Sequence, residues 1–546
     1  MTISYDDTAI DEIVWDAIRE SDCIDDYKAY LGHNLAKTAH ADDAMSAIEC
    51  LDEADDVGSA RYPVAYSQVL ALADSGQASA QFHVAKMLAN GFGVGRDLVN
   101  AVKWYQLAVH QGDLRATVNL ALMGLEGSAT SFGPAKAFDL LRAAIAKGEG
   151  RAAVVLARMH ASGSGVPKDV SAAQELLIQA WEHGESEAAL EMGRMLSANR
   201  NPELSEVAWE WIERAADAGN VSASTMLGYM AESEGRIDEA IAHYKTAARA
   251  GNDDAAKALG TLYLLGKGVP ADGTEAVKWL RPAALRGHTG AQYNLAIAYR
   301  DGVGVIPNRQ TARKWMKRAA LGGDINAKVR YAEMAIEEEP AEAVGHLMDA
   351  AKAGNALAQA RLGLACKNGC GIAADPAAAY KWIRLSALQK EPLGLYLMGW
   401  ATQAGVGVEA DAKQALVWFR KGAELGDAAS QYRFGVAHLV GEGTERDIAE
   451  AAFWLTKSAD QGFAEAERGI GMMFLFGDGV EENAAEAANW LESAARKNDP
   501  HAQFVLGRLY ASGQGVDRDT EVARDWIERA AALGHSDAKD WLQSAE

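Results

Sequence analysis

The sequence has few cysteines and no long apolar run. Among its 546 residues there are only four cysteines, Cys23, Cys50, Cys366 and Cys370. The first residues, Met1–Asp7, lack the basic and apolar regions of a secretory signal. No apolar run approaches the roughly 18 residues that a membrane-spanning helix needs. We therefore expect a cytoplasmic protein with free thiols and no membrane insertion.

Sequence motifs that carry catalysis or bind metals are also missing. The 12 histidines show no H-E-x-x-H and no close metal-spaced pair, and no G-x-S-x-G nucleophile elbow occurs. Cys366 and Cys370 form a C-x₃-C cluster without a second Cys or His pair to complete a zinc site. A structural role is favoured for this pair, with a redox or metal role as the alternative. We predict no catalytic residues, no cofactor and no metal.

Basic residues are scarce near the N-terminus. The formal net charge is −23, and residues 1–60 hold 16 acidic residues against Arg19, Lys28 and Lys37, a local net charge of −13. Because an acidic protein repels phosphate backbones, nucleic acid is not expected as a partner. The acidic segment has two interpretations: a soluble, solvated cap, or a docking element for a basic protein partner.

Tryptophans recur at a fixed interval. Trp382, Trp418, Trp454, Trp490 and Trp526 are 36 residues apart, and Trp279 and Trp315 keep the same interval. Nine units carry a Gly-x-Gly loop whose first glycine is Gly91, Gly163, Gly266, Gly302, Gly369, Gly405, Gly441, Gly477 or Gly513. Asp or Asn follows six residues later, Ala ten later, and Trp thirteen later in all but one unit, where Leu176 stands. Such a period indicates stacked supersecondary units.

Each recurring residue has a physical role in a helix–turn–helix unit. The first glycine ends one helix in the left-handed conformation, and the Asp or Asn caps the next helix. The alanine allows close helix packing, and the tryptophan is expected to fill the same buried face. Apolar residues three and four positions apart, as in Ala291–Tyr299, predict an amphipathic first helix.

This composite pattern resembles the Sel1-like repeat, a relative of the tetratricopeptide repeat. The motif reads Ala-x-x-x-Leu-Gly-x-x-Tyr, then Gly-x-Gly-Val-x-x-Asp, then Ala-x-x-Trp-x-x-x-Ala-Ala-x-x-Gly. The resemblance covers residues 78–535 in about thirteen units. It implies an all-α fold, a right-handed superhelical solenoid, that serves mainly as a protein-binding scaffold.

Three segments are predicted from this register. Residues 1–77 form an acidic helical N-terminal cap, residues 78–535 the repeat array, and residues 536–546 a C-terminal capping helix. Units near residues 220–251 and 324–354 are shortened and lack the Gly-x-Gly loop. His243 and His346 stand where other units have tryptophan and are expected to replace it in packing.

The resemblance implies a non-enzymatic scaffold that holds one or more proteins or peptides on the concave surface of the solenoid. Residues eight positions before the turn glycine are the candidate contacts, because the core does not fix them: His83, Asn294, Arg361 and Arg433. The alternative is an enzyme or regulator of the Sel1-like class, for example with β-lactamase-like activity. The cysteine pair per repeat that accompanies that activity is absent here.

Overall fold

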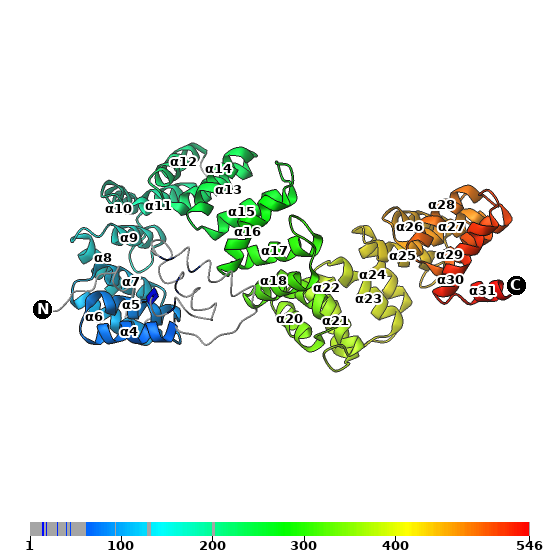
Figure 1. The fold of residues 1–546 in the computed structure, drawn as a ribbon, viewed down its shortest axis with the longest axis horizontal. Coiled ribbons are helices and arrows are strands. Elements are labelled where there is room, and N and C mark those ends of the chain that lie inside the picture. Colours follow the sequence, from blue (N-terminus) through cyan, green and yellow to red (C-terminus); the bar gives the residue numbers. More distant parts are fainter. Residues whose placement is uncertain are drawn as a thin grey trace. The chain divides into compact units, whose positions relative to one another are not determined.

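The computed structural model describes residues 62–92, 94–127, 133–198 and 202–544, together with Val14, Trp15, Ile18, Tyr30, His40 and Ala44. These residues contain 28 helices and no strand, which confirms the predicted all-α repeat fold (Figure 1). None of the described helices is both long and apolar enough to cross a membrane.

In the first part of the chain the helices are α4 (Tyr62–Asp74), α5 (Ala78–Asn90), α6 (Leu98–His110), α7 (Leu114–Leu125), α8 (Pro134–Ile145), α9 (Gly150–Ser162), α10 (Val170–Glu182), α11 (Ser186–Ser197), α12 (Pro202–Asp217), α13 (Val221–Ser233), α14 (Ile237–Arg249), α15 (Asp253–Leu265), α16 (Gly273–Leu285), α17 (Thr289–Asp301) and α18 (Arg309–Leu321). They are followed by α19 (Ile325–Ala335), α20 (Pro340–Lys352), α21 (Ala356–Asn368), α22 (Pro376–Leu388), α23 (Pro392–Ala404), α24 (Ala412–Glu424), α25 (Ala428–Val440), α26 (Ile448–Asp460), α27 (Ala464–Phe476), α28 (Ala484–Arg496), α29 (Pro500–Ser512), α30 (Thr520–Ala532) and α31 (Ser536–Ser544).

The helices from α5 to α30 form thirteen consecutive pairs, each with a first and a second helix. The chain divides into two compact units, Met1–Gly322 and Gly323–Glu546. The first unit contains α4 to α18, and the second contains α19 to α31. Within each unit, every helix packs against the next, as expected for a repeat array whose core is built between neighbours.

The Asp and Asn residues predicted to cap second helices all do so. The side chain of Asp447, for example, accepts a hydrogen bond from the backbone N–H of Glu450 at 3.0 Å. The same contact occurs at the other capping positions, Asp97, Asp169, Asp272, Asn308, Asp375, Asp411, Asn483 and Asp519. Most first helices carry an equivalent cap, which the sequence analysis did not predict: Asp113, Asn220, Asn252, His288, Asp324, Asn355, Asp427 and Asp499.

Both glycines of the Gly-x-Gly loop are required by the backbone. Gly441 ends α25 with a φ of 77°, and Gly443 has a φ of 76°. A Cβ on Gly443 would also lie 2.5 Å from the carbonyl oxygen of Ala412 at the start of α24. The second glycine therefore sets the spacing between consecutive repeats, a role beyond the tight turn that the sequence predicts.

Glycine also sets the spacing inside many of the helix pairs. A Cβ on Gly507 in α29 would lie 2.6 Å from Cγ1 of Ile527 in α30, and one on Gly399 in α23 would lie 2.6 Å from the Phe419 ring in α24. The second-helix side chain therefore fills the space that glycine leaves on the first helix. Alanines complete these small cores, which recur along the array.

Most tryptophans of the 36-residue series lie at the edge of the core, which corrects the expectation that they fill its buried face. Trp315 and Trp454 are buried, but Trp418 and Trp526 are half-buried. Lys421 lies 4.2 Å from the centroid of the Trp418 ring, and a cationic side chain covers the ring in this way at several repeats. The ring therefore packs on the core with one face and meets a cation with the other.

The two shortened units still form helix pairs, α13–α14 and α19–α20. A tyrosine hydroxyl holds each short turn: Tyr244 donates to Glu232 at 2.9 Å, and Tyr331 donates to Glu339 at 2.6 Å. His346 is largely buried and packs edge-on against Tyr331, with 5.1 Å between ring centroids. A short hydrogen-bonded turn therefore replaces the glycine loop.

The two ends of the array are described to different extents. The predicted acidic cap, residues 1–77, lies mostly outside the described residues and stays a prediction, although α4 packs against α5. At the other end, Trp541 and Leu542 of α31 pack against Ile527 of α30, so α31 covers the last helix pair.

Candidate protein-binding surface

All four residues predicted as contacts lie on first helices, but they differ in accessibility. His83 in α5 has 3% of its surface exposed, so its side chain is not presented to a partner. Asn294 in α17 is half-buried and donates to Thr261 Oγ1 at 2.8 Å. Arg433 in α25 is half-buried, and Arg361 in α21 is exposed.

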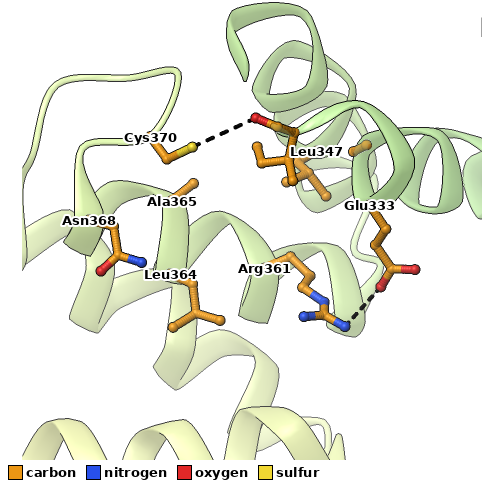
Figure 2. Close-up of a pocket in the computed structure, with 9 residues that line it drawn as sticks. Glu333, Leu347, Arg361, Leu364, Ala365, Asn368 and Cys370 are labelled. Atoms are coloured by element: carbon orange, nitrogen blue, oxygen red, sulfur yellow. Dashed lines mark hydrogen bonds and ion pairs between the residues drawn. The ribbon is translucent and has the colours of Figure 1, made fainter. Parts of the chain in front are cut away.

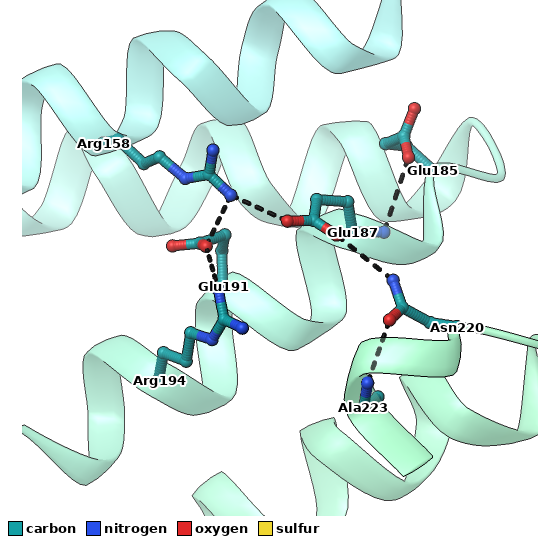
Figure 3. Close-up of polar contacts among 7 residues, drawn as sticks. All are labelled: Arg158, Glu185, Glu187, Glu191, Arg194, Asn220 and Ala223. Carbon is teal, nitrogen blue, oxygen red and sulfur yellow. Dashed lines mark hydrogen bonds and ion pairs between the residues drawn. The ribbon is translucent and has the colours of Figure 1, made fainter. Parts of the chain in front are cut away.

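Within each unit, consecutive first helices lie side by side, as α9 and α11 do in the first unit and α21 and α23 in the second, and we call the surface they form the first-helix face. In the first unit, this face carries a polar network across α9, α11 and α13 (Figure 3). Arg158 pairs with Glu187 at 2.8 Å and with Glu191 at 2.5 Å, and Arg194 also pairs with Glu191. Asn220 donates to Glu187 at 3.2 Å. Burial opposes the charge of Arg158, but its hydrogen bonds and charge contacts with the two glutamates outweigh this and raise its pKa. The charged side chains of this face therefore pair with one another.

In the second unit, a pocket of about 460 Å³ opens between α19, α20 and α21 (Figure 2). Its apolar lining comes from Ala332, Ile336, Leu347, Leu364 and Ala365, and its polar lining from Glu333, Arg361, Asn368 and Cys370. Arg361 lies 3.0 Å from Glu333 Oε1, and Arg330 lies 2.8 Å from Glu333 Oε2. Of the four predicted contact residues, Arg361 lines this pocket, which we call the Arg361 pocket.

A groove crosses α25, α27, α29 and α31. Two pockets of about 490 and 680 Å³ share Met472 and Val505, so they are continuous. Tyr432, Phe504 and Phe476 supply much of the apolar lining. We call this surface the C-terminal groove. Half-exposed aromatic and aliphatic side chains in a concave site are typical of a surface that binds a partner.

The cysteines offer little chemistry. Cys366 is buried, and burial, followed by the nearby Asp375 charge, raises the pKa of its thiol, which disfavours the reactive thiolate. Cys370 is half-buried and unpaired, and its thiol donates a long contact of 4.0 Å to the Ile336 carbonyl. Within the described part of the chain, no group of three His, Cys, Asp or Glu side chains is placed to hold a metal ion.

The family model of the Sel1 repeat matches this chain over residues 78–113, 114–149, 150–185, 186–220, 222–252, 253–288, 289–324, 356–390, 392–427, 428–463, 464–499 and 500–535. The chain belongs to the Sel1 repeat family. Of the thirteen helix pairs, α19–α20 falls outside the twelve matched Sel1 repeats, and this pair forms one wall of the Arg361 pocket.

Solved structures of Sel1 repeat proteins resemble this chain. The protective antigen c5321 of uropathogenic Escherichia coli, described as displaying an SLR fold, is 26% identical with a TM-score of 0.51, covering 87% of this chain and 97% of that one. A Sel1 repeat protein from Oxalobacter formigenes is 30% identical with a TM-score of 0.40, covering 62% of this chain and 90% of that one. No curated protein sequence matches the chain.

Several residues that line the pockets were not predicted from the sequence. Leu364, Val436 and Met472 line the pockets and stand five positions before the turn glycine, not eight. On a helix, residues three apart share a face, so the same register could have identified this second position. Glu333 had no such signal, because its repeat lacks the turn glycine from which positions are counted.

Proposed function

We propose that this Sel1 repeat protein is a non-enzymatic interaction scaffold that binds a partner protein along the first-helix face. The observation that carries the proposal is the C-terminal groove, where half-exposed apolar side chains from four helices line one continuous concavity. Exposed apolar surface of this kind is costly in water and favours covering by a partner.

Repeat architecture supports the same function. Consecutive first helices present the same positions at regular intervals, and capped helices with glycine-fixed spacing hold those positions in place. Sel1 repeat proteins are generally scaffolds rather than enzymes. The net charge of −23 favours a protein over a nucleic acid as the partner.

The experiment compares partner capture by three purified full-length proteins added to extracts of the native cells. The groove variant carries Val436→Asp and Val505→Asp, which place charge in the apolar lining. The control variant carries Val417→Asp and Phe453→Asp, at second-helix positions that are 44% and 50% exposed.

We expect the wild type and the control variant to capture the same partner and the groove variant to lose it, with all three melting at similar temperatures. Equal capture by the groove variant, or loss only in the control variant, would contradict a partner on the first-helix face.

A further inference from the structure

The Arg361 pocket exists because its repeat has smaller side chains than the repeat that follows. Leu364 stands five residues before its turn glycine, where the next repeat has Trp400. Counted from the first-helix caps, Ile336 occupies the position that Lys367 occupies one repeat later. The pocket is lined by Ile336 and Leu364, and therefore lies where the following repeat places a tryptophan beneath a lysine.

In that following repeat the equivalent space is filled by the chain itself. Trp400 packs against the core that includes Leu395 and Met398, and Lys367 Nζ lies 4.9 Å from the centroid of its ring. An indole covered by a cation thus occupies the site between α21 and α23. Between α19 and α21 the same site is a pocket of about 460 Å³.

The polar groups around the pocket match an aromatic side chain that carries a hydrogen-bond donor. The side chain of Arg361 is 42% exposed, and a guanidinium is the cation most often found over aromatic rings. Glu333 Oε1 is buried and forms an ion pair with Arg361, but it accepts no hydrogen bond from the described residues. Since a carboxylate oxygen can accept more than one hydrogen bond, a donor on a bound ring could add to this ion pair.

We propose that this pocket binds an indole or phenol side chain of a partner protein. The ring packs against Leu347 and Leu364, the Arg361 guanidinium lies over its face, and its N–H or O–H donates to Glu333. The proposal rests on the proposed function for the nature of the partner and adds the side chain by which that partner is recognised.

Methyl-labelled full-length protein is titrated with N-acetyl-tryptophanamide and, separately, with N-acetyl-leucinamide, and NMR follows the methyl signals of Leu347, Leu364 and Ala365. We expect saturable shifts with the tryptophan amide and at least several-fold weaker binding of the leucine amide. No saturable shift with the tryptophan amide, or equal affinity for both amides, would overturn the proposal.

Two variants locate the binding. Leu364→Trp reproduces the neighbouring repeat and should abolish the shifts at Leu347, whereas Ile297→Trp, at the same repeat position in α17, should leave them unchanged. Arg361→Met does not depend on how Leu364→Trp folds, and should weaken the tryptophan amide about two- to fivefold. Unchanged affinity in Arg361→Met, or in a folded Leu364→Trp, would contradict the assigned geometry.

The titration tests the aromatic pocket separately from the scaffold function. A partner captured through the C-terminal groove, without binding of the tryptophan amide, would leave the scaffold function standing and remove only the aromatic pocket. If the tryptophan amide binds at Leu364 but the groove variant still captures the partner, the aromatic pocket would stand and the partner site in the C-terminal groove would be removed.

Discussion

Single residues decide how closely the two helices pack in many of the repeats. Gly507 has Ile527 Cγ1 at 2.6 Å and the Ala523 carbonyl at 2.9 Å from the position of an added Cβ, so neither neighbour can yield easily. In contrast, a Cβ on Gly469 in α27 would meet only Leu455, at 3.8 Å. The same substitution should therefore have opposite effects at the two glycines.

We predict that Gly507→Ala lowers the free energy of unfolding by about 1–3 kcal/mol, the usual cost of overpacking a core. Gly469→Ala should raise it by roughly 0.5–1 kcal/mol, since alanine costs less entropy in a helix. Urea unfolding followed by circular dichroism measures both. Equal effects of the two substitutions would show that Gly507 is not in close contact with α30.

Lys390 occupies a turn position that is glycine in most repeats. Its φ is 60°, in the left-handed region, and the equivalent Gly426 has a φ of 90° with open space around its Cβ position. The left-handed conformation is strained for a residue that has a Cβ and not for glycine. Lys390→Gly should therefore stabilise the protein by about 0.5–1 kcal/mol, and Gly426→Ala should destabilise it by about 1 kcal/mol. Urea midpoints that move the other way would contradict this assignment.

Between elements, the Gly-x-Gly loop joins one repeat to the preceding one. Gly443→Ala would bring a Cβ against the Ala412 carbonyl and adds strain at a positive φ, so we expect a loss of about 2 kcal/mol or more. Glu442 is exposed between the two glycines, and Glu442→Ala should change stability by less than about 0.5 kcal/mol. Thermal melts of the two variants test whether the loop glycine has a structural role. Comparable losses of stability in Gly443→Ala and Glu442→Ala would contradict that role.

His535 caps the N-terminus of the terminal helix α31 and contacts His501. His535 Nδ1 accepts from the Ala538 N–H at 3.3 Å, so its proton is on Nε2, which lies 2.9 Å from His501 Nδ1. Burial and then His501 lower the pKa of His535 below its usual 6.5, although Asp537 and Asp499 oppose this. The neutral form is therefore favoured in the folded state, and protonation would break the cap.

A histidine with a lowered folded pKa contributes stability that is present above about pH 6.5 and is lost as the pH falls through the folded pKa. We predict that the melting temperature declines below pH 6.5 and that His535→Asn, which keeps a capping oxygen as at Asn355, removes this step. An identical pH profile for the wild type and His535→Asn would contradict the role of this cap.

The helices were predictable from the sequence because the same local signals recur in most helix pairs. Periodic alanines, turn glycines and Asp or Asn caps act within one helix pair, so counting positions located them. The register also contained a buried glutamine that went unrecognised: Gln431 donates to the Ala423 carbonyl at 3.2 Å and accepts from Gln461 at 2.7 Å. Gln431 thus links its own helix pair to the preceding one, and this contact cannot be read from the signals of a single repeat.

The candidate site was less predictable, because a pocket is a difference between neighbouring repeats. The Arg361 pocket depends on Leu364 being smaller than Trp400 and on a turn without the glycine loop, neither of which a shared motif reveals. The burial of His83 was not predictable either, since burial depends on tertiary packing. Arg361 was selected from the sequence because its position varies freely among repeats, and its role as a partner contact stays a prediction.

At the scale of the whole molecule, stability is distributed along the array. Each compact unit contains several small cores built from successive helix pairs, such as those around Leu177 in the first unit and Leu491 in the second. Damage to one repeat should therefore affect its neighbours first. A partner that spans several first helices would contact many repeats at once, which suits a scaffold.

Site-specific photo-crosslinking in native cells tests the scaffold function most directly. A photoreactive phenylalanine analogue replaces Arg361, Arg433 or Val505 on first helices, and Leu385, Val417 or Phe453 on second helices. We predict crosslinks to the same partner protein from the first-helix positions and none from the second-helix positions. Crosslinks confined to second helices, or no protein adduct from any first-helix position, would contradict a partner bound along the first-helix face.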